Sequence, residues 1–203
     1  MGVSIYIFVV TLLFSLPLGL LVSFGRMSKN PIVSGIFKIY ISVMRGTPLM
    51  LQLMVVYFGP YYIFGIHVSN SYRIVAALIG FVINYAAYFA EIYRGGIQSM
   101  DRGQYEAAEV LGYSKSQTFF IIILPQVIKR ILPPVTNEVI TLVKDTSLAF
   151  TISVAEMFTT AKALASSQTS MMPFVAAAIF YYVFNFVVAY VMEFFEKKLS
   201  YYR

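Results

Sequence analysis

The sequence predicts an all-α membrane protein with five transmembrane helices, the N-terminus outside the cell and the C-terminus in the cytoplasm. Of its 203 residues, 59% are hydrophobic and only 12% are charged, which is too apolar for a soluble domain of this length. The apolar residues fall into runs of about 20, the length that an α-helix needs to cross a bilayer core. We therefore expect residues 1–203 to form a single transmembrane domain.

The first three predicted helices follow from the apolar runs and their breaks. The first covers residues 4–25 and lacks the charged start of a cleavable signal peptide, so we expect it to be retained, and natural residues could precede it. The second covers residues 39–58 and is interrupted by Arg45-Gly46-Thr47-Pro48, because glycine and proline break helices. The third covers residues 73–93.

The second half of the chain contains the last two predicted helices. Residues 98–117 are too polar to lie in hydrocarbon, and residues 119–132 are short and broken by proline and basic residues, which favours an interfacial or buried segment. We place the fourth helix from Pro133 to about residue 157, since proline is favoured in a first turn. A polar loop over residues 162–168 then leads to the fifth helix, residues 173–193.

The distribution of basic residues predicts the orientation. One basic residue, Lys144, lies inside the fourth predicted helix, and only Arg73 and Lys162 fall on the side that we predict to be outside. By the positive-inside tendency, the other side is cytoplasmic. Its basic residues are Arg26, Lys29, Lys38, Arg45, Arg94, Arg102, Lys115, Lys129, Arg130, Lys197, Lys198 and Arg203.

Composition also excludes several kinds of chemistry. A net charge of +6 could suggest nucleic acid, but here the basic residues punctuate apolar runs instead of clustering on a soluble face, so we expect no nucleic-acid partner. The chain has no cysteine, which excludes disulfides and thiol catalysis. The single histidine, His67, cannot by itself form a histidine-based metal site, and we expect no metal.

The polar stretch between the third and fourth predicted helices carries a spaced pattern. It reads Glu-Ala-Ala, three residues, Gly, nine residues, Ile, any residue and Leu-Pro. The fixed positions are Glu106, Ala107, Ala108, Gly112, Ile122, Leu124 and Pro125.

The physical properties of this stretch favour a short, protruding helix. Residues 104–111 are good helix formers, and Gly112 can end the helix in a left-handed conformation. The two small alanines of the pattern let a partner surface approach closely, while Glu106 and Glu109 offer charge-assisted contacts. The alternative is a loop of mixed charge that merely solvates a turn.

The spaced pattern resembles the cytoplasmic loop of permease subunits of binding-protein-dependent type I ABC importers, and every fixed position matches. The resemblance covers almost the whole chain and is to the subfamily that handles polar amino acids: histidine, arginine, glutamine, glutamate or cystine. The other matching segments are Arg45-Gly46-Thr47-Pro48 with Gln52 and Tyr57-Phe58-Gly59, Ala90 to Gly96, and Lys144-Asp145-Thr146-Ser147-Leu148.

The resemblance implies a set of partners. A coupling helix in the loop at about residues 98–125 would dock in a groove of a dimeric ATP-binding cassette ATPase. A second permease subunit, identical or different, would complete the path, and an extracytoplasmic binding protein would deliver the amino acid. No phosphate-binding Gly-x-x-x-x-Gly-Lys-Ser/Thr motif occurs in this chain, so we expect ATP and Mg to be bound by the ATPase and no catalytic residue here. The location implied is a bacterial cell membrane.

Three acidic residues of the fourth predicted helix suggest where cargo binds. Asp145 lies seven residues after Glu138 and eleven before Glu156. At about 100° per residue, all three fall within about 20° of one line along a continuous helix. Ionisable groups in a membrane helix are costly and are functional candidates by default.

This acidic stripe predicts a basic cargo. Facing the cavity between two subunits, it would bind the side chain of arginine, lysine or histidine by its charge. The zwitterionic part of the amino acid would be bound by Thr146, Ser147, Asn84 or backbone groups.

Structural roles for the same carboxylates compete with this hypothesis. Asp145 can pair with Lys144 or with the partner subunit, and Glu138 and Glu156 can lie near the two ends of the helix. The segment 144–148 can also distort the helix. Elsewhere, Glu91 and Arg94 are three residues apart, which favours a local ion pair.

Two other classes of function remain as rivals. A passive channel subunit would conduct without nucleotide but gives no reason for the spaced loop. A membrane-embedded enzyme would need a convergent catalytic set that the sequence does not supply. Within the importer class, glutamine, glutamate or cystine is the alternative cargo.

Overall fold

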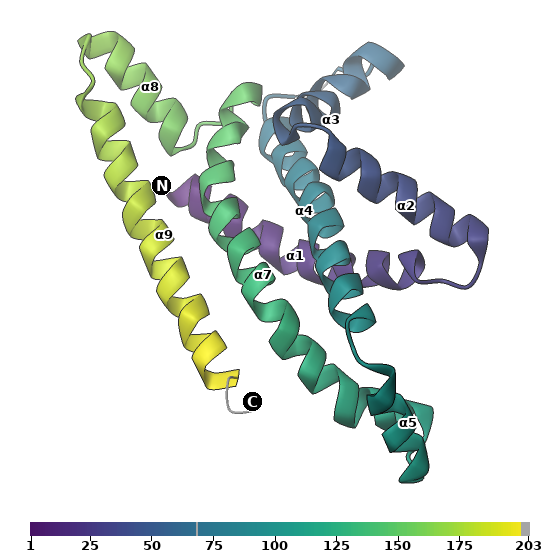
Figure 1. Cartoon of the computed structure of the whole chain (residues 1–203). Helices are drawn as coiled ribbons and strands as arrows, with labels where there is room; N and C mark the ends of the chain where they lie inside the picture. Colours follow the sequence, from purple (N-terminus) through teal and green to yellow (C-terminus); the bar gives the residue numbers. More distant parts are fainter. Residues whose placement is uncertain (68, 200–203) are drawn as a thin grey trace.

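The structure, a computed structural model, describes residues 1–67 and 69–199, and these form helices joined by short turns with no strand among them (Figure 1). Arg203, one of the basic residues that predict the orientation, lies outside the described residues. The helices are α1 (Gly2–Arg26), α2 (Pro31–Gly46), α3 (Leu49–Phe64), α4 (Tyr72–Gln98), α5 (Arg102–Val110), α6 (Lys115–Gln117), the π-helix η1 (Thr118–Ile123), α7 (Leu124–Asp145), the 3₁₀-helix η2 (Thr146–Ile152), α8 (Met157–Gln168) and α9 (Met172–Leu199).

Four helical segments are long and apolar enough to cross a membrane: α1, α4, α9 and the continuous run Lys115–Ile152. A fifth candidate span is the pair α2 and α3, which is bent by 110° between Gly46 and Leu49. The all-helical prediction is confirmed for the described residues, and the count agrees with five spans when the bent pair is taken as one.

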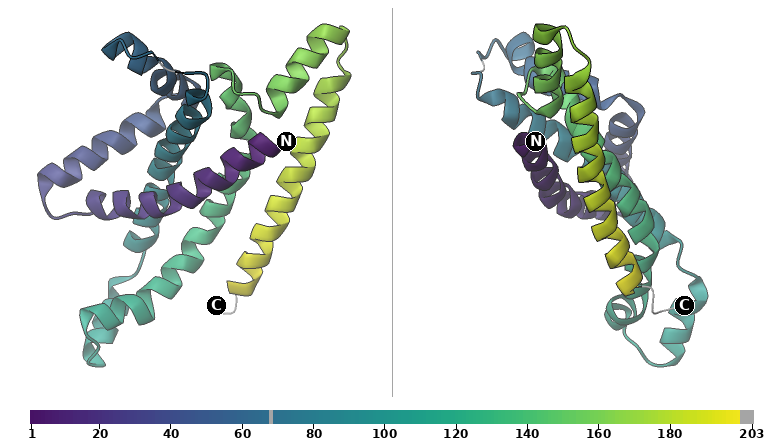
Figure 2. Two further views of the ribbon diagram at one scale, coloured as in Figure 1. Left: turned by 180° about the vertical axis from the view of Figure 1, so that it is seen from behind. Right: turned by 90° about the vertical axis from the view of Figure 1, so that its left-hand side faces the viewer.

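The helices diverge from a central contact between α1 and α4. In Figure 1, α1 crosses behind α7 and α4, and α9 runs beside α7. Figure 2 shows α3 and α8 at one end of the molecule and α5 at the opposite end, toward which α9 also runs. The loop that follows α4 therefore projects beyond the spans.

The contact between α1 and α4 depends on small residues spaced four apart. Thr11, Ser15, Gly19 and Ser23 lie on one face of α1 and are buried. A Cβ atom at Gly19 would lie 2.9 Å from the Cβ atom of Phe89 and 3.1 Å from a backbone oxygen, so only glycine fits without moving α4. Small residues are the usual means by which membrane helices approach closely.

The break between α2 and α3 is held by a glutamine. The side-chain amide of Gln52 donates hydrogen bonds to the carbonyl oxygens of Met44 (2.9 Å) and Thr47 (3.1 Å), and to the Thr47 hydroxyl (2.9 Å). Carbonyls at a helix end lack partners within the helix, and burying them unpaired is costly. Gln52 thus stabilises the sharp bend that the Gly-Thr-Pro sequence begins.

The start of the fourth predicted helix was wrong. α7 begins at Leu124 instead of Pro133, and both Pro133 and Pro134 lie inside it. Proline removes a backbone donor, yet membrane helices tolerate it because neighbouring groups satisfy the freed carbonyls. The separate interfacial segment predicted over residues 119–132 is instead the π-helix and the first turns of α7.

The end of the fourth helix was also wrong, as was the loop after it. The α-helix stops at Asp145, where η2 begins, and Ser153 then takes a left-handed conformation with φ of 59°. The hydroxyls of Thr146, Ser147 and Thr151 each donate to the carbonyl three residues earlier, which matches the tighter 3₁₀ geometry. The predicted polar loop over residues 162–168 is part of α8.

Candidate functional site

The spaced pattern lies on α5, a short helix with defined ends. Asp101 caps its start by accepting a hydrogen bond from the Gly103 amide at 2.8 Å. At its end, Gly112 has a φ of 80°, and the amide of Tyr113 donates to the carbonyl of Ala108 at 3.0 Å. The predicted short helix with a left-handed glycine stop is confirmed.

The outer surface of α5 combines charge with exposed apolar side chains. Glu106, Ala107 and Glu109 are exposed, as a contact surface requires. Val110 and Leu111 at its end are 88% and 73% exposed. Sequence reasoning missed these two, although two large apolar residues directly before a glycine stop were the available signal.

Ala108 corrects one part of the prediction. It is only 1% exposed, because α5 packs against η1 on that side. Its small size therefore serves the packing of α5 on its own chain, and of the two alanines only Ala107 is available to a partner.

A second group of polar side chains lies where α4 meets the end of α7. The hydroxyl of Tyr85, which is 2% exposed, donates a hydrogen bond of 2.7 Å to the Asp145 carboxylate. Glu138 lies two turns earlier on the same face of α7 and is half-buried. The two carboxylates thus share one face, as the sequence predicted.

Arg45 and Tyr88 extend this group toward the break between α2 and α3. The guanidinium of Arg45 lies over the ring of Tyr88, 5.3 Å from its centroid, and the Tyr88 ring is 6.2 Å from that of Tyr85. Glu138 lies within electrostatic range of the Arg45 guanidinium and the Asp145 carboxylate. We call Arg45, Tyr85, Tyr88, Glu138 and Asp145 the charged cluster.

Sequence reasoning did not assign Arg45 to a site. The available signal was a charge between two apolar runs, because such a charge needs a partner or a polar cavity. The cluster presents one cationic and two anionic groups, so it can interact with both charges of a zwitterion.

Glu156 does not belong to this cluster, which corrects the predicted stripe. It is 1% exposed and caps α8, accepting hydrogen bonds from the amides of Phe158 (2.7 Å) and Thr159 (2.6 Å). The Tyr181 hydroxyl also donates to it at 3.0 Å. Because the α-helix ends at Asp145, the assumption of one continuous helix through Glu156 fails.

The three residues predicted to bind the zwitterion lie in separate surroundings. Asn84 is buried, and its amide donates to the Gln52 side chain at 2.9 Å and to the Met44 carbonyl at 3.1 Å. Thr146 is fully buried, and its hydroxyl donates a hydrogen bond to the Val143 carbonyl.

The third of these residues, Ser147, lines a cavity of about 390 Å³ beside α8 and α9. Its hydroxyl donates to the carbonyl of Lys144, which lines the same cavity. Asp145, between them in the chain, is directed elsewhere, to Tyr85. The structure therefore does not bring Asn84, Thr146 and Ser147 together.

The predicted ion pair on α4 is confirmed. Arg94 contacts the Glu91 carboxylate with a nitrogen–oxygen distance of 2.5 Å, and its guanidinium donates to both carboxylate oxygens. Both side chains are thereby accounted for without cargo.

Comparison with known proteins identifies a family. Residues 15–201 match the family model described as binding-protein-dependent transport system inner membrane component. The fold also superposes on a solved structure described as an amino acid ABC transporter with histidines, with a TM-score of 0.88 and 30% sequence identity. The superposition covers 98% of this chain and 91% of that chain.

Curated relatives from Bacillus subtilis are similar over nearly the whole chain. The probable amino-acid ABC transporter permease protein YckA is 40% identical, covering 99% of this chain and 88% of its own. The L-cystine transport system permease protein TcyL is 39% identical, covering 98% and 84%. The arginine transport system permease protein ArtQ is 34% identical, covering 98% and 90%.

Proposed function

Because the chain belongs to the family of binding-protein-dependent transport system inner membrane components, we propose that it is the permease subunit of an ATP-driven amino-acid importer. It is a multi-pass membrane protein, and its bacterial relatives support a place in a bacterial cell membrane. The observation that carries the proposal is α5: a capped helix that carries the spaced pattern and projects beyond the spans (Figure 1).

The proposed orientation puts α5 and the end of α9 in the cytoplasm and the N-terminus outside. The distribution of basic residues supports it, since Lys115, Lys129 and Arg130 lie near α5 in the chain, while Lys162 lies on α8 at the opposite end (Figure 2). In this orientation the exposed side chains of Val110 and Leu111 face a cytoplasmic partner.

The proposed mechanism is alternating access driven from α5. Two permease subunits, identical or different, stand on two ATPase subunits that bind ATP and Mg. Closure of the ATPases moves the α5 helices together and opens the outer side to a loaded binding protein, and hydrolysis resets the complex. Cargo biases this cycle only through different affinities for the two states.

The charged cluster supports a polar and basic cargo. Asp145 and Glu138 share one face of α7, so together they favour a cationic side chain, arginine, lysine or histidine. Arg45 then pairs with the cargo carboxylate. This assignment retains Asp145 and Glu138 from the predicted stripe and leaves Glu156, Asn84 and Thr146 in structural roles.

Relatives named for arginine and for cystine show that the family carries more than one cargo, and cystine, glutamine or glutamate is the alternative.

Uptake in proteoliposomes tests this proposal. The chain is reconstituted with its ATPase and binding protein, and labelled arginine competes with lysine, histidine, glutamine and cystine. We expect uptake that requires ATP, prefers basic amino acids and falls at least tenfold in Asp145→Asn. Glu193→Gln is the matched control, because Glu193 lies on α9 with a side chain 59% exposed.

The outcomes separate the two levels of the proposal. Flux that ignores ATP refutes the importer. ATP-dependent uptake of glutamine or cystine keeps the importer and refutes the basic cargo.

A further inference from the structure

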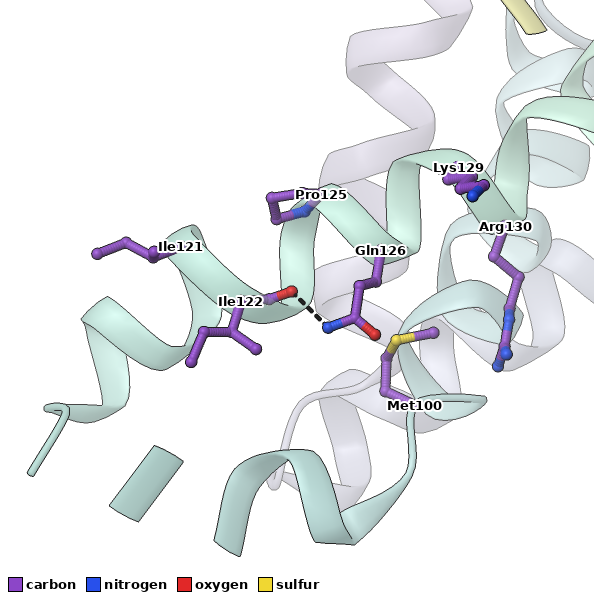
Figure 3. A pocket seen from close by; sticks show the side chains of 7 residues that line it. All are labelled: Met100, Ile121, Ile122, Pro125, Gln126, Lys129 and Arg130. Atoms are coloured by element: carbon purple, nitrogen blue, oxygen red, sulfur yellow. Dashed lines mark hydrogen bonds between the residues drawn. The ribbon is translucent and has the colours of Figure 1, made fainter. Parts of the chain in front are cut away.

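The cation of the charged cluster, Arg45, lies directly before the bend between α2 and α3, and its side chain is exposed. It is not enclosed by the large cavity of the chain, of about 680 Å³, which lies at the beginning of α7 and is lined by Met100 and by residues between 121 and 130 (Figure 3). Among the described residues, no carboxylate forms an ion pair with Arg45. The direction of its guanidinium therefore depends on the backbone that carries it and on the ring of Tyr88.

The backbone on both sides of Arg45 is held by one side chain. Gln52, which is 8% exposed, reaches back across the bend from the start of α3. Its amide group shares two protons among the carbonyl oxygen of Met44 (2.9 Å) and the carbonyl (3.1 Å) and hydroxyl (2.9 Å) oxygens of Thr47. The Thr47 hydroxyl donates in turn to the carbonyl of Val43 at 2.8 Å. These contacts fix the segment from which the guanidinium projects.

One stretch of α4 connects this segment to the carboxylate of the cluster. Asn84 donates to the side-chain oxygen of Gln52 at 2.9 Å, and Tyr88, one turn later on the same face, lies 5.3 Å from the guanidinium. Tyr85, next to Asn84, donates to Asp145. The distance between the cation and this carboxylate is therefore set by α4, as long as Gln52 holds the bend in place.

We propose that Gln52 is a positioning residue of the cargo site, which holds Arg45 where it can pair with the carboxylate of a basic amino acid. The inference rests on the proposed cargo site and adds a source of its specificity. A guanidinium binds a carboxylate through two parallel hydrogen bonds, so a change in its direction loses the contact. A looser bend leaves Asp145 in place, because Tyr85 donates to it from α4, and weakens only the carboxylate end of the cargo.

Two ligands that differ only in the carboxylate test this role. Agmatine is arginine without its carboxylate, and it keeps the guanidinium and the amine. Both compounds are titrated in labelled form against the purified complex of permease and ATPase in lipid nanodiscs, without binding protein, which gives a Kd for each. The parent is expected to bind arginine about tenfold more tightly or better, because agmatine lacks the charge-assisted pair. The ratio of the two Kd values does not depend on the fraction of complex that is folded.

Variants then show which residues this preference for arginine needs. Gln52→Met removes the amide and keeps the length of the side chain, and its preference is expected to fall to within about twofold of that in Arg45→Gln. The double variant is expected to lose nothing more, because two changes that act on one contact are not additive. Gln52→Asn keeps an amide for folding but is one methylene too short to span both carbonyls, and the same direction of change is expected.

Asn84→Leu is the matched control. It also removes a buried polar partner from this network, but it leaves the Gln52 amide on the carbonyls on both sides of the bend, so the preference for arginine is expected to stay. Asp145→Asn is expected to weaken both ligands alike, because it acts on the guanidinium end that they share.

A spin-label distance reports the bend without any cargo. The chain has no cysteine, so Ile36→Cys with Ile63→Cys places one label on each arm at an exposed position, in complexes diluted with unlabelled chain. The labels lie ten residues before the end of α2 and fourteen after the start of α3, so the arms are about 15 Å and about 21 Å long. With the bend of 110°, the two backbone positions lie about 20 Å apart, against about 36 Å in a straight helix. Gln52→Met is expected to broaden the distribution toward longer distances, and Asn84→Leu to leave it as in the parent.

The outcomes separate this inference from the proposed function. A preference for arginine that survives Gln52→Met but is lost in Arg45→Gln overturns the positioning role, and so does a label distance that Gln52→Met leaves unchanged. A preference that survives Arg45→Gln overturns the cargo site and the role of Gln52 with it, while ATP-dependent uptake keeps the importer. A parent that binds neither ligand refutes the basic cargo, and the label distance then decides whether Gln52 holds the segment of Arg45.

Discussion

Glu156→Gln separates a structural carboxylate from one that binds cargo. The Glu156 carboxylate accepts hydrogen bonds from the amide of Phe158 and the hydroxyl of Tyr181 at one oxygen, and from the amide of Thr159 at the other. The Thr159 hydroxyl shares its single proton between this second oxygen (3.0 Å) and the Val154 carbonyl (2.8 Å). Glutamine has the same shape but only one acceptor oxygen. One backbone amide must then face an NH₂ group inside the protein, where Glu156 is 1% exposed.

The expected loss of stability follows from these contacts. Hydrogen bonds to a charged group contribute about 1.5–3 kcal/mol, and an amide left unpaired in a buried site costs about 1–3 kcal/mol. The hydroxyl on the same side can rotate to accept from the new NH₂ group, which recovers part of the loss. We expect the free energy of unfolding to fall by about 2–4 kcal/mol.

Two measurements on purified variants decide the question. Denaturant unfolding in mixed micelles, followed by circular dichroism, gives the stability, and uptake per folded complex in proteoliposomes gives KM for the cargo. Tyr181→Phe removes one of these donors and is expected to cost about 1.5 kcal/mol. KM is expected to stay within about twofold of the parent, since Glu156 is enclosed by its own chain. An unchanged unfolding free energy together with a tenfold rise in KM would refute this reasoning and return Glu156 to the cargo site.

Three further predictions follow from the packing and from α5. Gly19→Ala is expected to destabilise the chain by about 1–3 kcal/mol in the same unfolding assay, because the added methyl group meets the backbone of α4. Its control, Gly35→Ala, is expected to be neutral or stabilising, because a Cβ atom there has no other atom within 4 Å. Asn84→Leu is expected to cost about 2 kcal/mol by leaving the buried side-chain oxygen of Gln52 without a donor, without altering cargo preference in competition uptake. Val110→Asp is expected to reduce binding of the ATPase at least tenfold in a pull-down while leaving the unfolding free energy unchanged, because the side chain is 88% exposed.

The features predicted well from the sequence depend on local chemistry. The first helix was placed at residues 4–25 and is observed as Gly2–Arg26, because a long apolar run bounded by a basic loop admits few other structures. The stop of α5 at Gly112 needed only a good helix former followed by a glycine. The pair Glu91 and Arg94 needed only its spacing.

The features predicted wrongly depend on contacts between distant segments. The consecutive prolines Pro133 and Pro134 predicted the start of a helix, yet the observed helix runs through both of them. Asn84 looked like a polar group for cargo, but its partners come from α2 and α3, across a bend whose geometry no local pattern specifies. The inward packing of Ala108 likewise required knowing where η1 lies.

The broken acidic stripe shows how a small change in helix geometry redirects a functional prediction. Residues of a 3₁₀-helix advance about 120° instead of 100°, so the seven residues of η2 alone rotate whatever follows by about 140° relative to a continuous α-helix. The left-handed turn at Ser153 then changes the chain direction. Asp145 and Glu138 precede this change and stay on one face, whereas Glu156 follows it and becomes the cap of α8. The sequence carried the cause in the hydroxyls after Asp145, each of which donates to a carbonyl three residues back and favours the tighter turn. The proposed binding of a cargo that carries both charges therefore depends on two carboxylates and one guanidinium in place of three carboxylates, with Arg45 as the cation that the stripe lacked.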